Sequence, residues 1–154
     1  MRLKKIFDAV VKKDSKFRLL IIGRDPAPEI LELAKTAGVT VTGPVDNVWE
    51  YIAKVDVFVF PMVSGAGQQN KVLEAMYGEK VVICNSLANS GVGATNQTHL
   101  LVRETDKDFA DAILNVKRQR EAMRAIAASG KAFVRERYSW EKIIPLLEKF
   151  WFSV

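Results

Sequence analysis

The sequence predicts an α/β fold, a Rossmann-like, doubly wound parallel sheet. Short apolar runs bounded by Gly or Pro alternate along the chain with segments of helical periodicity. Most of these runs are apolar at successive positions, which is typical of parallel strands covered by helices on both faces. The 154 residues are enough for one domain with its own core. We therefore expect a single domain over residues 1–154.

The predicted strands follow one another with a helix between most pairs. They fall at residues 18–23, 39–43, 57–61, 80–85 and 99–102. The run HLLV is the shortest of them, and His99 at its start is expected at the surface. The run KVVICN holds the single cysteine, Cys84, which we interpret as a packed core thiol.

Helices are predicted between and after these strands. The first residues of the chain include several basic ones, and we expect a surface helix to begin near Leu3. Pro28 and Gly38 bracket the next helix, Asp46 and Asn47 cap another, and Gly78 ends the helix of residues 69–77. Residues 107–129 read as one helix with a single apolar stripe, and residues 86–97 as a long loop. The last helix is expected to begin at Ser139, with a kink or break at Pro145.

Composition excludes several classes of protein. One cysteine and one histidine allow neither an internal disulfide nor a Cys/His zinc site, and this cysteine usage suits a reducing, cytoplasmic compartment. The apolar runs are too short to span a bilayer. The net charge is +5, but the basic residues are spread along the chain, and Lys117–Arg124 are interpreted as a solvated helix face. Trp49, Trp140 and Trp151 are interpreted as packing residues.

The stretch SGAGQQNKVLEA, after the predicted strand at 57–61, brings glycines, side-chain amides, a lysine and a glutamate close together. Ligands bind beyond the carboxyl ends of strands in such sheets, and Gly65 and Gly67 let the backbone approach a ligand closely. The next helix offers free N–H groups to an anion. Lys71 in its first turn opposes the helix dipole, which a bound phosphate would neutralise. Glu74 suits the two hydroxyls of a ribose. A glycine turn before an ordinary helix remains the alternative.

Several motifs, in the right order, resemble the group 1 (family 4) glycosyltransferases. The central one is SGAGQQNKVLEAMYGEKVV; the others include FRLLIIGRDPAPEI, GVTVTGPVDNVWEYIAKVDVFVFP, DFADAI and ERYSW, and together they span residues 17–150. The resemblance implies the C-terminal, donor-binding half of a GT-B fold. It also implies a nucleotide-diphosphate sugar donor of the UDP or GDP type, transfer with retention at the anomeric carbon, and no required metal or other cofactor.

The resemblance also implies roles for individual residues. Glu74 matches the glutamate that holds the ribose, and Lys71 is assigned to the phosphates as the residue acting in catalysis. The loop against the diphosphate and donor sugar corresponds to Gly65, Ala66 and Gly67, with helix amides reaching to Asn70. The loop that packs on the base corresponds to Gly43, Pro44 and Val45. A turn near the diphosphate falls at residues 90–93.

The sequence departs from the family pattern in two places. Many relatives have a sugar-contacting glutamate where this chain has Ala66, so Gln68, Gln69 or the backbone is expected to contact the sugar instead. The first, central strand of the donor domain, the loop cation after it and the N-terminal acceptor domain have no counterpart in the 154 residues. We therefore expect the chain alone to be inactive. Either the remaining strands close up or a partner fills the gap, which leaves a homodimer open.

Two other classes of function stay open at this point. A non-catalytic α/β nucleotide-binding or regulatory module would share the fold; a phosphoacceptor receiver domain would need an acidic cluster that the sequence lacks. A nucleic-acid or membrane-surface protein would gather its basic residues on one face. We expect no nucleic acid as partner. The expected partners are a nucleotide sugar, a saccharide or lipid-linked acceptor, and the missing acceptor domain, with peripheral membrane association of the full enzyme left open.

Overall fold

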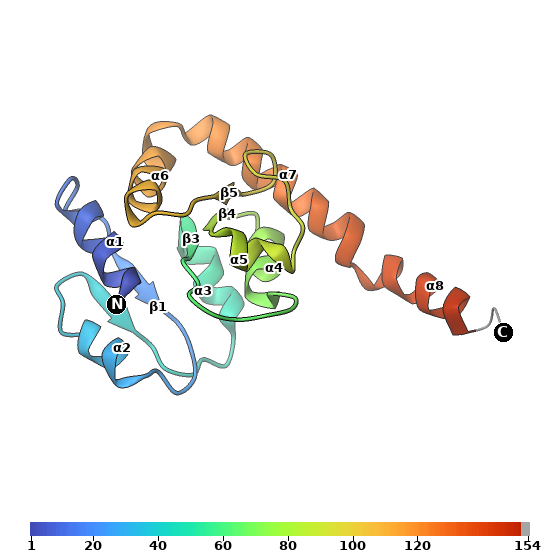
Figure 1. The fold of residues 1–154 in the computed structure, drawn as a ribbon, viewed down its shortest axis with the longest axis horizontal. Helices are drawn as coiled ribbons and strands as arrows, with labels where there is room; N and C mark the ends of the chain where they lie inside the picture. Colours follow the sequence, from blue (N-terminus) through green and yellow to red (C-terminus); the bar gives the residue numbers. More distant parts are fainter. Residues whose placement is uncertain (152–154) are drawn as a thin grey trace.

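A computed structural model describes residues 1–151, without the side chains of Leu146, Leu147 and Phe150. The five predicted strands are all confirmed, in shorter form, as β1 (Leu19–Ile21), β2 (Val39–Val41), β3 (Val57–Phe60), β4 (Val81–Cys84) and β5 (Leu101–Val102). The helices are α1 (Arg2–Val11), α2 (Pro28–Leu33), α3 (Val48–Lys54), α4 (Asn70–Tyr77), α5 (Ser86–Ser90), α6 (Asp106–Arg118), α7 (Arg120–Tyr138) and α8 (Trp140–Trp151). Figure 1 shows their arrangement.

The strands form two separate parallel sheets instead of one. β1 pairs with β2, with Leu19 opposite Val39, and the second sheet has the order β3-β4-β5, with Val57 opposite Val81. Among residues 1–151, β1, β2, β3 and β5 each have one edge without a partner strand, and only β4 is paired on both sides. This division agrees with the expectation of a doubly wound sheet that lacks one strand.

Helices cover both faces of the three-stranded sheet, as predicted for a doubly wound fold. On one face, Phe58 and Phe60 of β3 pack against a buried cluster that α4 and α7 help to build; it includes Val72, Met76, Val82, Cys84, Leu100 and Phe133. On the opposite face, Val57 and Val59 pack against buried residues of β4, of α1 and α6 and of the start of α7, among them Ile83, Ile6, Val10, Phe109, Ile113 and Met123. Because successive side chains of β3 point to opposite faces of the sheet, they pack into two different cores.

The helix α1 is not only a surface helix, because its apolar face connects both sheets. Ile6 and Val10 belong to the core of the three-stranded sheet, whereas Phe7 joins Leu33 and Val39 in the small core of the two-stranded sheet. In the turn just after α1, Asp14 pairs with Lys117 of α6, with Nζ of Lys117 and Oδ2 of Asp14 separated by 2.6 Å. The helix therefore holds the two sheets together where no strand pairing does.

The single helix predicted for residues 107–129 is wrong, because the chain bends at Gln119 and forms α6 and α7. Gln119 has φ −117° and ψ 49°, outside the helical region. The bend lets Phe109 of α6 and Met123 of α7 reach the same core. A capping box between Thr105 and Asp108 starts α6. The basic cluster expected on one helix is consequently divided between two.

Two further expectations need correction. The segment read as a loop at residues 86–97 contains α5, which Asn85 caps by accepting a hydrogen bond from the Ala88 N–H at 3.2 Å. Ser139 does begin the last helix, but through its carbonyl, which accepts hydrogen bonds from the N–H groups of Lys142 and Ile143. Its buried Oγ has no hydrogen-bond partner among the described residues. Helix α8 also continues through Pro145 without a break. Residues 152–154 of the predicted helix lie outside the described residues.

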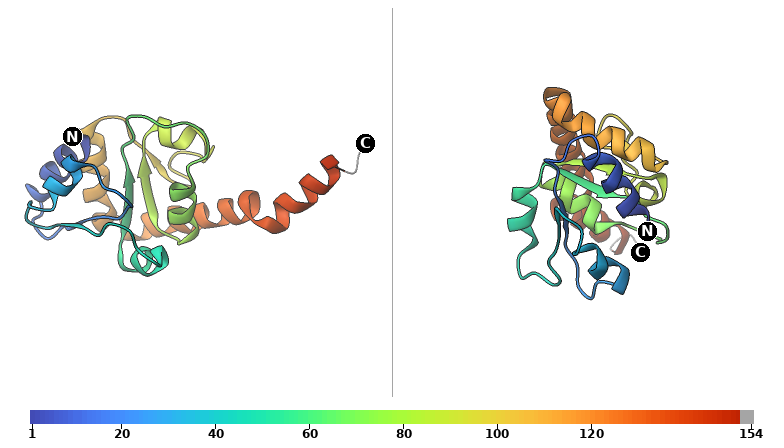
Figure 2. Two further views of the ribbon diagram at one scale, coloured as in Figure 1. Left: turned by 90° about the horizontal axis from the view of Figure 1, so that it is seen from below. Right: turned by 90° about the vertical axis from the view of Figure 1, so that its left-hand side faces the viewer.

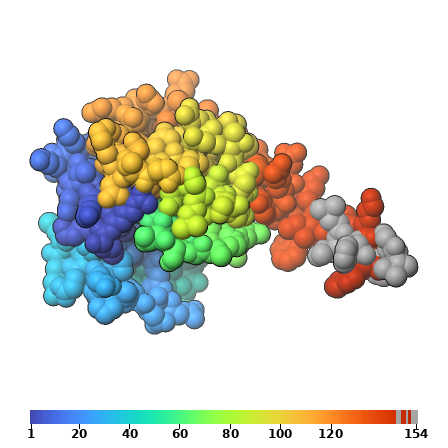
Figure 3. All heavy atoms as spheres, viewed as in Figure 1, coloured from blue at the N-terminus to red at the C-terminus, as the bar shows by residue number. Residues whose placement is uncertain are grey.

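Helix α8 extends away from the body of the molecule (Figures 2 and 3). Trp140 and Trp151 are each 73% exposed, so their interpretation as packing residues is wrong within this chain. Trp49 does pack, edge-on against Tyr77 with ring centroids 5.9 Å apart. Asn47 caps α3 as predicted, accepting from the Trp49 N–H at 3.0 Å. No helix within residues 1–151 combines the length and the apolar character needed to cross a membrane.

Candidate functional site

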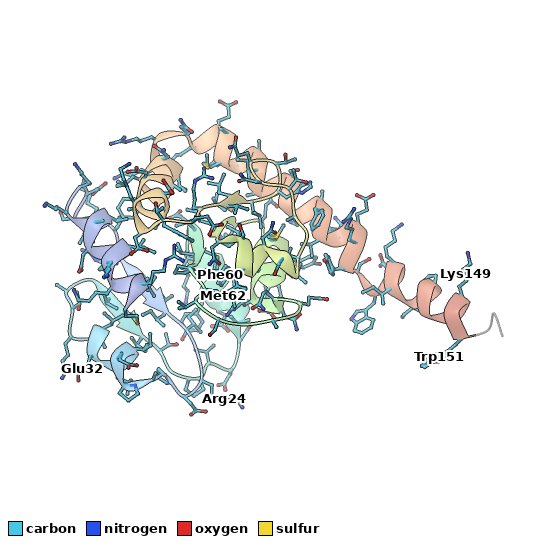
Figure 4. The ribbon with its side chains drawn as sticks, viewed as in Figure 1. Arg24, Glu32, Phe60, Met62, Lys149 and Trp151 are labelled. Carbon is cyan, nitrogen blue, oxygen red and sulfur yellow. The ribbon has the colours of Figure 1, made fainter. Side chains whose placement is uncertain are left out.

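The glycine-rich stretch lies at the carboxyl edge of the three-stranded sheet. The chain leaves β3 at Phe60, passes through residues 61–69 and enters α4 at Asn70. In Figure 4, Phe60 and Met62 lie near the middle of the molecule, whereas Arg24, in the loop after β1, lies at its margin. Met62 is tied to the next strand, because its carbonyl accepts a 2.7 Å hydrogen bond from the side chain of Asn85. The predicted position of this stretch is confirmed.

Gly65 and Gly67 hold backbone conformations that suit glycine alone. Their φ values are +136° and +73°, in the left-handed region that other residues rarely adopt. A Cβ at Gly65 would also collide with Cε of Met62. The loop is therefore shaped by its glycines, as the sequence indicated.

Residues distant in sequence come together at Gly67. Gly91, at the end of α5, lies so close that a Cβ there would overlap the carbonyl oxygen of Gly67. Val92 anchors the same turn from behind, since its carbonyl accepts a 2.7 Å hydrogen bond from the Tyr138 hydroxyl. The turn predicted at residues 90–93 thus packs directly on the loop of residues 65–67. Gly91 itself has an ordinary φ of −85°, so only its packing against Gly67 shows why a glycine stands there.

The start of α4 leaves backbone N–H groups free. Gln69 is the N-cap residue, and its side chain makes no capping hydrogen bond. The N–H groups of the first turn have no acceptor within a helix, so those of Asn70 and Lys71 are available to a ligand. The helix runs for eight residues and buries Val72, Leu73, Ala75 and Met76. That apolar side fixes the direction in which the free N–H groups point.

The three amide side chains before Lys71 serve the loop itself. Nε2 of Gln69 donates to the carbonyl of Gly67 at 3.2 Å and to that of Ala66 at 3.4 Å. Nε2 of Gln68 lies 3.5 Å from Oδ1 of Asn70. Gln69 is only half exposed, whereas Gln68 and Asn70 are exposed. Of the two glutamines expected at the sugar, Gln68 is therefore the freer to meet a ligand.

Lys71 and Glu74 stand on the exposed side of α4, one turn apart. Both side chains are exposed, and within the described part of the chain neither makes a hydrogen bond or an ion pair. Other lysines on the surface, such as Lys117 and Lys131, do form ion pairs with acidic side chains. An ammonium and a carboxylate close to free helix N–H groups can bind an anion and a polyol side by side.

The second predicted loop, Gly43 to Val45, follows β2 in the other sheet. Gly43 has φ +70° and its carbonyl accepts from the Thr42 hydroxyl at 2.9 Å and from the Gly23 N–H at 3.4 Å. Pro44 is exposed, and Val45 is half-buried. The hydrogen bonds of this loop run to the loop after β1, and none described here reaches residues 65–74. The two loops share the carboxyl edge but stand in different sheets.

Sequence reasoning missed Asn85 as a supporting residue of the site. Its side chain is the only polar one that is buried among the described residues, with 6% exposed, and it joins the loop after β3 to the start of α5. An Asn directly after a buried strand and before Ser-Leu-Ala is an N-cap pattern that the sequence did offer. Its bond to the Met62 carbonyl is a tertiary contact that no local pattern predicts.

The remaining titratable groups show ordinary structural roles. Cys84 is completely buried, which confirms the packed core thiol, and this burial raises the pKa of the thiol to about 12. His99 is half-buried, stacked on Phe133 with ring centroids 4.6 Å apart, and its Nδ1 accepts from the Thr95 N–H, so the surface interpretation holds only in part. Among residues 1–151 there is no group of three or more His, Cys, Asp or Glu placed to share a metal ion.

Comparison with known proteins adds independent information. Residues 1–119 match the protein family described as "Glycosyl transferases group 1". A curated relative from Klebsiella pneumoniae, an uncharacterized 44.6 kDa protein in the cps region, is 26% identical over 96% of this chain and 40% of its own length. This chain therefore spans well under half of that relative.

Solved structures share the fold at low identity. HepE from Anabaena, crystallised with UDP and glucose, matches 98% of this chain and 44% of its own with a TM-score of 0.84 and 14% identity. The C-terminal domain of the group 1 glycosyltransferase LpcC from Francisella tularensis matches 90% of this chain and 78% of its own, with a TM-score of 0.77 and 16% identity. Sucrose-phosphate synthase from Thermosynechococcus elongatus matches 97% of this chain and 41% of its own, with a TM-score of 0.81 and 19% identity.

The likeness to these structures establishes a GT-B glycosyltransferase half-fold, and the matched family covers residues 1–119, most of the chain. The chain belongs to the group 1 glycosyltransferase family.

Proposed function

We propose that this chain is the donor-binding half of a glycosyltransferase and holds a nucleotide-diphosphate sugar at the start of α4. The observation that carries the proposal is the pair Lys71 and Glu74, exposed and without partners among residues 1–151, beside the free N–H groups that follow Gly65–Gly67. Neither side chain contributes to packing, so a ligand gives the best account of both. The UDP in the Anabaena crystal structure supports a uridine nucleotide, with a guanosine one as the alternative.

Each group has a role that its chemistry fits. The diphosphate lies against Gly65, Ala66 and Gly67, where the N–H groups of Asn70 and Lys71 and the Lys71 ammonium neutralise its charge. The Glu74 carboxylate accepts hydrogen bonds from the two ribose hydroxyls. Gly43, Pro44 and Val45 pack on the base. Gln68 contacts the sugar in place of the acid that many relatives carry at the Ala66 position.

The reaction breaks the bond between the anomeric carbon and the diphosphate. Positive charge develops on the sugar ring, and negative charge builds on the leaving group. Lys71 and the N–H groups of α4 stabilise that leaving group, which is the contribution that a divalent cation makes in other transferases. We propose retention at the anomeric carbon and transfer without a metal ion, to a saccharide or lipid-linked acceptor bound by a second domain.

The chain alone is proposed to bind its donor but to transfer nothing. Holding donor and acceptor together requires both walls of the cleft, and this chain spans only 40% of the Klebsiella relative and 44–45% of the Anabaena chains. We place the enzyme in the cytoplasm, with peripheral association with the membrane where the acceptor is lipid-linked. Sugar transfer by the 154-residue chain alone would contradict the half-enzyme proposal.

The proposal is tested by titrating UDP, GDP and the matching nucleosides into the chain by calorimetry. Replacing Glu74 by Ala should weaken nucleoside and nucleotide binding alike by about 1–3 kcal/mol, because hydrogen bonds from the ribose are lost, whereas Glu74→Gln should lose less. Glu121→Ala, an exposed carboxylate in the first turn of α7, is the matched control and should bind normally.

A second variant distinguishes binding of the phosphates from binding of the nucleoside. Lys71→Ala should weaken diphosphate binding more than nucleoside binding, and the difference should shrink as salt is raised. Lys142→Ala on α8 removes the same charge elsewhere and serves as its control. Equal losses for both ligands would give Lys71 a structural role and remove it from the phosphate site.

A further inference from the structure

The turn of residues 90–93 packs on the glycine-rich loop at one peptide group. A Cβ at Gly91 would overlap the carbonyl oxygen of Gly67 more closely than the carbonyl carbon, so this carbonyl points toward Gly91. The same oxygen also accepts a 3.2 Å hydrogen bond from Nε2 of Gln69. Two groups from different segments therefore fix the orientation of the Gly67 carbonyl.

This orientation decides where the next backbone N–H group points. The peptide between Gly67 and Gln68 is trans, and the C=O and N–H of a trans peptide point in opposite directions. The Gln68 N–H is therefore directed away from Gly91. It has no hydrogen-bond partner among residues 1–151, and Gln68 is exposed. A displacement of Gly91 would consequently turn a free donor that lies just before the free N–H groups of α4.

The turn itself is held together by Asn89. Its carbonyl accepts hydrogen bonds from the N–H groups of Val92 and Gly93 at 2.9 and 2.8 Å. Its side chain bonds to both backbone groups of Ala94. Because these bonds lie within the turn, Gly91 and Val92 move together, and the position of the turn against the glycine-rich loop depends on contacts from outside it.

Tyr138 provides such a contact from α7. Its hydroxyl donates a 2.7 Å hydrogen bond to the Val92 carbonyl, and Val92 is only 2% exposed. Loss of the hydroxyl would leave this carbonyl buried without its donor, which favours a shift of the turn toward a new partner. The Tyr138 ring is held in turn by the buried Phe133, with ring centroids 6.1 Å apart.

Helix α7 does not need this hydroxyl for its own packing. Its buried residues are Met123, Ala127, Gly130, Phe133 and Val134. Tyr138 is the last residue of the helix and is half-buried. Tyr51 of α3 is also half-buried, yet its hydroxyl makes no hydrogen bond within the described part of the chain. The hydroxyl of Tyr138 therefore serves the turn.

We propose that Tyr138 is a positioning residue of the candidate donor site. Its hydroxyl holds Val92, and the turn then holds Gly91 against Gly67. The Gly67 peptide in turn directs the Gln68 N–H at the diphosphate. The diphosphate rests on the proposed function, whereas the series of contacts from Tyr138 to Gly67 does not. Hydrogen bonds weaken steeply when the donor turns away from its acceptor, so a small displacement of the turn is enough to weaken binding.

The first test compares Tyr138→Phe with Tyr51→Phe as the matched control. Both substitutions remove a hydroxyl and keep the ring, but only Tyr138 loses a hydrogen bond. In ¹⁵N spectra of the ligand-free chain, Tyr138→Phe should shift the backbone amide resonances of Gly67 and Gln68 together with those of residues 91–93. Tyr51→Phe should leave them unchanged. Unshifted Gly67 and Gln68 resonances in Tyr138→Phe would overturn the proposal, whatever the protein binds.

Calorimetry with UDP and uridine gives the second measurement. Tyr138→Phe should weaken UDP binding about three- to tenfold, the effect of one misdirected hydrogen bond, and should leave uridine binding within about twofold. A purely structural role would weaken both ligands equally, so equal losses, or no loss for UDP, would overturn the role in diphosphate binding. A wild-type chain that binds no UDP would contradict the proposed function instead, and the ligand-free resonances would still decide whether Tyr138 positions the loop.

Discussion

The two sheets of this molecule differ greatly in how well they are buried. The three-stranded sheet lies between two cores that together contain most of the buried side chains, and its central strand β4 is fully buried. The two-stranded sheet rests on a core of only three buried residues, Phe7, Leu33 and Val39. Strand composition does not explain the contrast, because the strands of both sheets consist mainly of Val, Leu and Ile, with Phe added in β3. The two sheets differ in how much of each is covered: both faces of the three-stranded sheet pack against large cores, whereas the two-stranded sheet packs against one small core.

This contrast also divides the candidate site. The loop of residues 65–67, the start of α4 and the turn at Gly91 belong to the well-buried unit, whereas Gly43, Pro44 and Val45 extend from the weaker one. The phosphate-binding side should therefore be preformed, and the base-binding side should open more easily. Elements with few buried apolar contacts open locally at low free energy.

The largest expected effect compares the same substitution in the two units. Leu100 is completely buried in the core under α4, and Leu33 is 4% exposed in the small core. Leu100→Ala should lower the free energy of unfolding by about 3–5 kcal/mol, and Leu33→Ala by no more than about 2 kcal/mol, since a loosely packed site collapses around the cavity. Urea unfolding measures both, and equal losses would mean that the two units are equally well packed.

A smaller effect tests how closely the two loops of the well-buried unit meet. Gly91→Ala places a Cβ on the Gly67 carbonyl oxygen and should cost about 1–3 kcal/mol while displacing the loop of residues 65–67. Gly23→Ala, in the loop after β1, meets no atom and has no left-handed backbone, so it should leave stability unchanged or raise it slightly. Thermal unfolding of both variants would decide, and a neutral Gly91→Ala would refute the close approach.

The smallest effect concerns the ion pair that ties α1 to α6. A hydrogen bond from Lys117, helped by the Lys16 backbone N–H, lowers the pKa of the Asp14 carboxyl. A lowered pKa contributes stability that is present above about pH 4, the ordinary range of Asp, and is lost as the pH falls further. Asp14→Asn should therefore flatten the decline in stability between about pH 5 and about pH 2. An unchanged slope would mean that the pair contributes nothing in solution.

The sequence predicted those strands and helices whose apolar residues form an uninterrupted run or repeat at helical spacing. All five strands and the helix that carries Lys71 and Glu74 were evident, because apolar runs and glycine stops are local signals. The bend at Gln119 was not, since neither Gly nor Pro marks it and the apolar stripe continues across it. Helix α5 was hidden for the opposite reason, because its short Ser/Asn-rich segment resembles a loop.

Contacts between distant segments were beyond local patterns. The Asn85 side chain bound to the Met62 carbonyl and the approach of Gly91 to Gly67 both depend on the tertiary fold. The exposure of Trp140 and Trp151 also contradicted the general expectation for tryptophan, because α8 leaves the body that could have covered them. Residue type predicts burial only where a partner surface exists.

The central claim is that the start of α4 in the well-buried unit holds a diphosphate. Its most direct test is to titrate UDP into the ¹⁵N-labelled chain and follow the backbone amide resonances. We predict that the largest shifts fall at Ala66, Gly67, Asn70, Lys71 and Gly91, and that those of the other four residues are smaller in Lys71→Ala at the same subsaturating UDP concentration. Shifts that gather instead on α7, or saturable binding that leaves residues 65–71 unperturbed, would contradict the account.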